Sequence, residues 1–192
     1  MVQGFPVQAL KLKGFRYFWY PKTITMIRLN NPYAGLHGFD CFGCNPGNPV
    51  GLKMEFHESG EEIISSWQPD DHYQGFIDVL HGGIQATMMD EIASWVVFVK
   101  MDTAGVTYRL NTRFRKPVHI SGGRVTLRAK MVRKVRNIAF IEVKLYDGNN
   151  RECSEGMVEY FLLSPDKARS EMYFPGKEAF YPGSKETSGD EV

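Results

Sequence analysis

The chain has 192 residues, of which 43% are hydrophobic and 13% aromatic, and its formal net charge is +1. This composition supports a hydrophobic core and excludes a globally disordered chain. The near-zero net charge gives no reason to expect a nucleic acid or a membrane surface as a partner.

Cysteine usage and hydropathy indicate the compartment. Three cysteines, an odd number, do not make a disulfide framework, and a reducing compartment fits them better. No segment reaches the roughly 18 uninterrupted apolar residues of a membrane span. The first residues do not show the apolar core of a signal peptide. We therefore expect a cytoplasmic protein.

Residues 1–40 are predicted to form an irregular N-terminal extension, with a short strand or helix at 24–27. Residues 15–20 read FRYFWY, and contiguous aromatic surface of this kind has to be covered. We expect the extension to pack on the main domain or on a partner subunit, as a lid over a pocket or as cover for an interface. Base stacking is a less favoured interpretation, because the sequence shows no nucleic-acid-binding module.

The main domain, residues 41–164, is predicted to open with a loop and two strands. Residues 41–49 read CFGCNPGNP, which is a tight, turn-rich loop. Residues 50–57 alternate well enough for a strand, and 61–68 are predicted to be its hairpin partner. Residues 69–79 are rich in Asp, His and Gly and are predicted to be a loop.

Residues 81–101 are predicted to form one long, mostly buried helix. The helix opens with His-Gly-Gly, and the stop signal Asp-Thr-Ala-Gly follows it at 102–105. Its centre carries an acidic pair, Asp90 and Glu91, among apolar residues. Charged side chains are rarely buried without a reason, so this pair calls for a structural or functional explanation.

Four β-rich runs follow the helix, at 106–116, 123–136, 138–147 and 151–163. Ser-Pro then ends the sheet, and residues 165–192 are predicted to be an extended C-terminal extension with a frayed end. The order of two strands, one long helix and four strands predicts an α+β domain. In this domain a curved antiparallel sheet wraps around one central helix.

The helix is predicted to have one small-residue face. At 100° per residue, the side chains that fall along this face are Gly83, Ala86, Thr87, Asp90, Ala93 and Ser94. Small residues permit the close approach of a ligand or of a second helix. Glu91 is rotated away, toward Met88 and Trp95.

The start of the helix is a candidate site for a polarised carbonyl. Gly82 and Gly83 leave the first N–H groups unshielded, and the helix dipole favours negative charge there. Asp90 lies roughly 13 Å further along the axis, too far to act with these groups on one small substrate. A shared reaction therefore requires Asp90 from a second copy, across a two-fold axis. The purely structural alternatives are a tight turn at HGG and a buried salt bridge from the acidic pair to a later Arg.

Three stretches resemble a known family. His81-Gly82-Gly83 followed by Asp90 resembles the HGG-x(6)-D/E helix motif of hotdog-fold thioesterases of the phenylacetyl-CoA thioesterase-like group. The phrase NTRFRKP at 111–117 and the order of elements are similar to the same family. The loop from CFGC to Gly-Leu at 51–52 resembles the lead-in of many members. The resemblance covers about residues 40–164.

The resemblance implies a hotdog fold that hydrolyses acyl-CoA thioesters to free acid and CoA at a dimer interface. The backbone N–H of Gly82 would polarise the thioester carbonyl. Asp90 of the facing subunit would be the nucleophile or the general base for water. Thr107 matches a position where members carry a hydroxyl that orients the water. No cofactor is implied, because coenzyme A is part of the substrate.

Further substrate contacts are implied around the helix start. His81 and Gly83 flank the polarising amide, and His81 is interpreted as a residue that fixes the turn rather than as a base. Some members have an Asn six residues before the His, where this chain has Gly75. Gln74 or His72 could take its place in holding the thioester.

Basic residues and cysteines suggest two further sites. Ten Lys or Arg and no Asp or Glu lie within residues 103–141. Some of these residues would suit the phosphates of CoA, and most are expected to be solvated strand positions.

The cysteines suggest a metal site, because His37, Cys41, Cys44 and His57 could hold zinc. A CxxC with two loosely placed His is a weak pattern, and the family carries no such metal, so no metal site is predicted. Cys153 is expected in the core.

Two functions of different classes remain open from the sequence. The first is an acyl-CoA thioesterase acting as a homodimer, with tetramers left open. The alternative is a non-catalytic hotdog protein that binds acyl-CoA or another hydrophobic ligand, which Gly75 favours and Asp90 opposes. A hotdog hydratase is disfavoured, because its Asp/His arrangement is not found here. The acyl group is not encoded in a pattern that we can identify.

Overall fold

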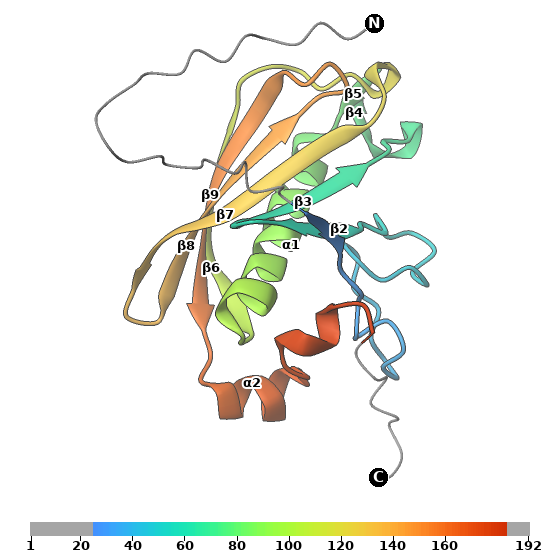
Figure 1. Cartoon of the computed structure of the whole chain (residues 1–192). Coiled ribbons are helices and arrows are strands. Elements are labelled where there is room, and N and C mark those ends of the chain that lie inside the picture. The colour runs from blue at the N-terminus through green and yellow to red at the C-terminus, as the bar shows by residue number, and fades with distance from the viewer. Residues whose placement is uncertain (1–24, 184–192) are drawn as a thin grey trace, which may run out of the picture.

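The computed structural model describes residues 25–183, and it shows a curved antiparallel sheet wrapped around one long helix (Figure 1). The sheet has seven strands in the order β1-β2-β3-β7-β8-β9-β6. The helix, α1 (Gly82–Met101), packs against five of them, β3, β6, β7, β8 and β9. The predicted α+β fold class is therefore confirmed.

Within this seven-stranded sheet, the strand positions follow the sequence pattern with one exception. The strands are β1 (Met26–Arg28), β2 (Phe56–Ser59), β3 (Glu62–Trp67), β6 (Gly105–Phe114), β7 (Val125–Val135), β8 (Ile138–Tyr146) and β9 (Glu152–Leu162). The strand predicted at 50–57 begins only at Phe56. Residues before it form a loop because the N–H groups of Leu52 and Met54 bond to the carbonyls of Phe42 and Gly43, at 2.7 and 2.9 Å.

The segment predicted as a loop at 69–79 contains a small hairpin. A 3₁₀ turn, η1 (Asp71–Tyr73), leads into β4 (Gln74–Phe76), which pairs with β5 (Val79–Leu80) immediately before α1. The tip carries Phe76 and Ile77, which are exposed. The two strands have only three and two residues, which is too short for a periodic pattern to indicate them.

The ends of α1 form as the sequence predicts. His81 is the N-cap, and its ring accepts a hydrogen bond from the N–H of Gly83. Asp102 adopts a left-handed conformation with φ of 50° and ends the helix. Glycine follows at position 105, where a Cβ atom would overlap the carbonyl oxygen of Phe161.

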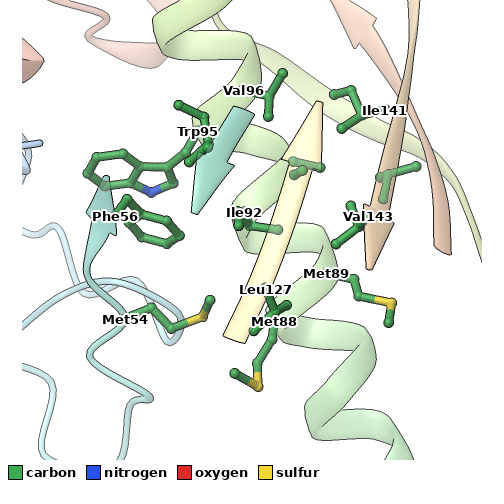
Figure 2. Packing of buried hydrophobic residues seen from close by; sticks show 14 of the residues in the cluster. Met54, Phe56, Met88, Met89, Ile92, Trp95, Val96, Leu127, Ile141 and Val143 are labelled. Atoms are coloured by element: carbon green, nitrogen blue, oxygen red, sulfur yellow. The ribbon is translucent and has the colours of Figure 1, made fainter. Parts of the chain in front are cut away.

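The core lies between the bulky side of α1 and the inner face of the sheet. Figure 2 shows Ile92 facing Leu127 and Val143 of the sheet, while Trp95 lies over Phe56. The last two rings stack with centroids 4.2 Å apart and an interplanar angle of 21°. Large apolar side chains that are fully buried in this way supply most of the stabilisation of a small domain.

The C-terminal segment is not extended, and this corrects the prediction for residues after 164. It forms α2 (Pro165–Met172) and the 3₁₀ turn η3 (Lys177–Phe180) beyond the C-terminal end of α1 (Figure 1). Ser164 and Pro165 do end the sheet, but the same pair is also a helix start, an N-cap Ser followed by Pro at the first position. The FRYFWY stretch at 15–20 and residues 184–192 lie outside the described residues.

Two aromatic residues join this segment to the core. Phe174 and Phe180 are buried. The ring centroid of Phe180 lies 5.3–6.1 Å from the ring centroids of Tyr33, Trp95, Phe98 and Phe174. Residues up to Phe180 therefore belong to the folded domain. No helix within residues 25–183 has the length and apolar character needed to cross a membrane.

This packing predicts that Phe180→Ala will lower the free energy of unfolding by about 3–5 kcal/mol, because it leaves a cavity among four aromatic rings. Urea unfolding followed by circular dichroism measures the change. Tyr173→Ala is the matched control: Tyr173 is 68% exposed, so its loss should change stability by no more than about 0.5 kcal/mol. A Phe180→Ala change as small as the control would contradict the assignment of this segment to the core.

Candidate active site

The small-residue face of α1 is the side of the helix that the sheet leaves open. Gly83 is exposed, and Ala86, Thr87, Asp90 and Ser94 are partly exposed. Ala93, which the sequence places on the same face, is fully buried. The open face is therefore slightly narrower than predicted, and Asp90 lies at its centre.

Asp90 is held by a neighbour that is distant in sequence. The hydroxyl of Thr107 on β6 donates to Oδ1 of Asp90 at 2.6 Å. The hydroxyl of Tyr160 on β9 donates to the backbone carbonyl of Asp90 at 3.3 Å. Thr107 thus contacts the carboxylate directly and fixes one of its two oxygens.

A bulge in β6 presents this threonine to the helix. Thr107 pairs with Tyr160 and Arg109 pairs with Glu159, so Tyr108 is an extra residue between two successive pairs. A bulge of this kind bends the strand and redirects its side chains. Its position, next to the candidate carboxylate, is typical of a functional site.

Burial raises the pKa of Asp90 above its ordinary value, and the hydrogen bond from Thr107, together with the nearby phenol of Tyr160, limits that rise. Burial also raises the pKa of Tyr160, so this phenol stays protonated and acts as a donor. A carboxylate with a raised pKa in a partly closed site is a candidate general base.

At the start of α1 the two glycine amides are not equivalent. Nδ1 of His81 accepts a hydrogen bond from the N–H of Gly83 at 2.8 Å, which confirms that His81 fixes the turn. The N–H of Gly82 has no acceptor among the described residues. It borders the ring of Phe114, which a Cβ atom on Gly82 would meet at 3.4 Å. The helix start therefore offers the N–H of Gly82 as a free donor beside this ring.

Gly75 and Gln74 lie in β4, next to this helix start. A Cβ atom on Gly75 would approach Cδ2 of His81 to 2.9 Å, so no larger side chain fits there without moving His81. The side-chain oxygen of Gln74 accepts from the N–H of Asp78 at 3.3 Å. His72 is exposed and pairs with Asp70. None of these side chains is held in place to replace the missing Asn.

A groove of about 360 Å³ runs along the start of α1. Its lining includes Gly82, Phe114, Arg115 and Lys116. Arg115 is paired with Glu152 and Glu155, whereas no ion pair of Lys116 occurs in the described part of the chain. Other members of the basic run, such as Arg109 and Arg128, pair with glutamates of adjacent strands, in line with the prediction that most are strand-surface positions.

Another cavity, of about 590 Å³, lies elsewhere. It is lined by residues of β1, of the 41–55 loop and by Trp95, and it includes neither Gly82 nor Asp90. Among the described residues, the His, Cys, Asp and Glu side chains close enough together to hold a metal ion are Cys41, Cys44 and Glu91. His37 and His57 are not part of this group, so the four-residue zinc site considered from sequence is not assembled.

Three supporting residues had no clear signal in the sequence. Gln85 is buried and bridges the carbonyl of Leu80 and the hydroxyl of Ser154, at 3.1 and 2.9 Å. Tyr160 and Phe114 reach the site from β9 and β6. A polar Gln in the apolar part of the helix could have drawn attention, but its partners depend on strand packing.

Part of the chain is similar to known proteins. Residues 78–154 match the family model described as "Thioesterase superfamily". A Thermoplasma acidophilum protein named "Putative esterase Ta0293" is 35% identical over 86 residues, which are 44% of this chain and 64% of that protein. The chain thus spans less than two thirds of the length of this relative.

Solved structures share the fold at low sequence identity. The thioesterase superfamily protein RHA08564 has a TM-score of 0.56 at 19% identity, over 61% of this chain and 57% of that one. Smu.793 from Streptococcus mutans, bound to acetyl CoA, has a TM-score of 0.54 at 16% identity, and the match covers 68% of this chain and 97% of that one. The E. coli PaaI protein of the phenylacetic acid degradation operon has a TM-score of 0.53 at 11% identity, and the match covers 59% of this chain and 81% of that one. The predicted resemblance to hotdog-fold thioesterases is confirmed.

The contact between Thr107 and Asp90 predicts a change in titration. Thr107→Val removes a hydrogen bond that lowers the pKa of Asp90, so the carboxyl of this variant should titrate at a higher pH than that of the wild type. Carboxyl carbon NMR, with the signal assigned by Asp90→Asn, measures this. Thr107→Ser keeps the hydroxyl and should titrate like the wild type; equal titration of the Val variant would show that the hydrogen bond is absent in solution.

Proposed function

Because residues 78–154 match the thioesterase superfamily and fold as a hotdog domain, we propose that the protein hydrolyses acyl-CoA thioesters to free acid and CoA. One observation carries this proposal. Asp90 lies on the open face of α1 with one carboxylate oxygen held by Thr107, and the same helix starts with a free N–H at Gly82. These are a base and an oxyanion donor.

The chemistry needs only these groups and water. The N–H of Gly82, with the helix dipole behind it, donates a hydrogen bond to the thioester carbonyl oxygen and stabilises the negative charge that grows there. Asp90 removes a proton from water while the water oxygen attacks the carbonyl carbon, and the C–S bond breaks to release the CoA thiolate. If Asp90 attacks the carbonyl itself, the thiolate leaves from the resulting adduct, and water then hydrolyses the acyl anhydride to free acid and regenerates Asp90. An oxyanion donor contributes about 10²–10³ in rate, and a positioned base contributes about 10²–10⁴.

Thr107 acts as a positioning residue in this proposal. Its single hydroxyl proton is donated to Oδ1 of Asp90, so its lone pairs remain free to accept a hydrogen bond from the attacking water. Oδ2 of Asp90 then accepts the second proton of the same water. This arrangement retains the predicted role of Thr107 in orienting water and adds a contact with the carboxylate.

Two copies of the chain are needed for one site. Gly82 and Asp90 are separated by eight residues of continuous helix, or about 12 Å along the axis. A two-fold axis that brings the open faces of two α1 helices together, antiparallel, places Asp90 of one copy near Gly82 of the other. The active species in this proposal is a homodimer; the geometry leaves open whether dimers form tetramers.

The surface beside the open face suits such a dimer. β6 is the last strand of the sheet, so one of its edges is unpaired within residues 25–183. It exposes apolar side chains, with Val106 at 49%, Tyr108 at 61% and Phe114 at 50%. An unpaired edge strand with exposed apolar residues favours pairing with another strand. Pairing of two β6 strands would also cover Phe114, next to Gly82.

Two observations support a CoA thioester as the substrate: the lining of the groove beside Gly82 and the ligand of a structurally similar protein. The Streptococcus mutans structure contains acetyl CoA, and the groove beside Gly82 presents Lys116. A lysine ammonium suits a phosphate of CoA as a point charge. Thiol release from a panel of short, long and aromatic acyl-CoAs identifies the acyl group.

One observation favours binding without catalysis as the second candidate. Gly75 packs against His81, so the position that holds the thioester through an Asn in some members has no side chain here. In this alternative, the chain binds acyl-CoA at equilibrium without releasing free thiol. Calorimetry together with the thiol-release assay separates the two functions.

We predict that Asp90→Asn lowers kcat by about 10²–10⁴-fold and leaves acyl-CoA binding largely intact, since the amide keeps the shape but is not a base. Asp166→Asn, on the exposed surface of α2, is the matched control and should keep wild-type turnover. Full turnover by Asp90→Asn over the whole panel would show that the assigned base is wrong.

The role of the Gly82 amide is tested by a pair of variants at one position. Gly82→Pro removes the N–H and is tolerated at the first position of a helix; the φ of −58° and ψ of 133° at His81 also suit a residue before proline. We expect kcat/KM to fall by about 10²–10³-fold. Gly82→Ala keeps the N–H, and its Cβ meets Phe114 at an ordinary contact distance, so it should remain active.

Asp90→Asn and Gly82→Pro together test whether one active site is built from two chains. Asp90→Asn and Gly82→Pro chains, co-expressed with different affinity tags and purified through both, form dimers with one intact and one doubly altered site. These dimers should recover about half of the wild-type activity. If the site lay within one chain, each chain of this dimer would carry a defect, and the activity would not return.

A further inference from the structure

A second group of reactive side chains lies on another side of α1, and the proposed reaction does not use it. The sulfur atoms of Cys41 and Cys44 and a carboxylate oxygen of Glu91 all lie within 4.8 Å of one another. Cys44 is buried, and Cys41 and Glu91 are partly buried. Two neighbouring residues of one helix thus lie in different environments: Asp90 lies on the open face, and Glu91 lies in this cluster.

Each sulfur atom accepts a hydrogen bond from nitrogen. The N–H of Gly43 donates to Sγ of Cys41 at 3.3 Å, and the side-chain amide of Asn31 donates to Sγ of Cys44 at 3.4 Å. N–H donors of this kind orient and stabilise thiolate ligands around a metal ion. The loop therefore holds the two sulfur atoms in fixed positions.

Glu91 is oriented toward the sulfur atoms by a ring on its own helix. Its Oε1 accepts a hydrogen bond from Nε1 of Trp95 at 3.2 Å, and its Oε2 accepts one from the thiol of Cys41 at 3.3 Å. No ion pair in the described part of the chain includes Glu91. A desolvated carboxylate without a cation is costly, and a bound cation would offset that cost.

Gly43, between the two cysteines, is required by this arrangement. A Cβ atom at this position would overlap Oε2 of Glu91. The backbone of the CxxC turn therefore comes into direct contact with the carboxylate. The CxxC turn and α1 therefore pack closely against each other where the three ligand atoms meet.

We propose that Cys41, Cys44 and Glu91 bind a zinc ion. Two thiolates and one carboxylate are three of the four ligands of a tetrahedral site, and water takes the fourth position. Thiolates select zinc over magnesium and calcium, which need oxygen ligands. Binding releases the thiol protons to solvent. Cys44 also lines the cavity of about 590 Å³, which gives the ion a path to the site.

The ion would join the 41–55 loop to α1, one residue away from Asp90. This loop carries Leu52 and Met54 into the core, and it replaces the regular strand predicted at 50–57. A cross-link of this kind explains why a turn-rich loop holds a fixed position against a buried helix. It also explains the second half of the acidic pair, for which thioester hydrolysis has no use.

The test is metal binding by the full, reduced chain, freed of metal with a chelator and then titrated with Co²⁺ and Zn²⁺. One equivalent of Co²⁺ should give the near-ultraviolet absorption of sulfur-to-cobalt charge transfer and the visible bands of a tetrahedral ion, and Zn²⁺ should displace it. Cys41→Ser and Cys44→Ser should each lose most of the charge-transfer band. Cys153→Ser is the matched control, because Cys153 lies in β9 outside the cluster, and it should keep the band.

A second pair of variants tests the geometry with all three ligands present. Gly43→Ala should weaken metal binding at least about tenfold, because the added methyl displaces Glu91. Gly35→Ala, where a Cβ atom would meet nothing within 4 Å, should bind like the wild type. The proposal is overturned if the wild type gives no thiolate band, if the band persists in both Cys41→Ser and Cys44→Ser, or if mass spectrometry shows that the native pair is a disulfide.

Discussion

The burial of α1 in the concave face of the sheet is the constraint on which the rest of the structure depends. Met88, Ile92, Trp95 and Val96 are almost completely buried, and the sheet curves to cover them. A helix surrounded on one side in this way has its rotation fixed, because turning it would expose these side chains to water. The small-residue face then has to point away from the sheet, and Asp90 points with it.

Fixed rotation also explains how adjacent acidic residues come to have different environments. Successive side chains on a helix are about 100° apart, so Asp90 reaches the open face while Glu91 turns toward the CxxC loop. Each carboxylate is held by residues from other segments, Asp90 by Thr107 and Glu91 by Trp95 and Cys41. One buried helix thereby organises two sites at the same height, and a shift of the helix would disturb both.

Much of the fold could be predicted from residue patterns. The helix at 81–101, its caps and the four strands after it follow from periodicity and turn chemistry, which act over short distances. The prediction was wrong where one local signal has two meanings or where partners are distant. Ser164-Pro165 both ends a strand and starts α2, and residues 50–55 alternate like a strand although their N–H groups bond within a loop.

The sequence by itself determined that one long helix carries an acidic pair in an apolar surround, that Gly82 lies at its start, and that Asp90 lies on the small-residue face. These properties depend only on helical spacing. Only the tertiary structure decided that Thr107 meets Asp90 through a bulge in β6, that His81 occupies the N–H of Gly83 and leaves that of Gly82 free, and that Glu91 meets two cysteines. These contacts join residues up to 50 positions apart, and they are set by how the sheet, the loop and the helix pack, which no local pattern records.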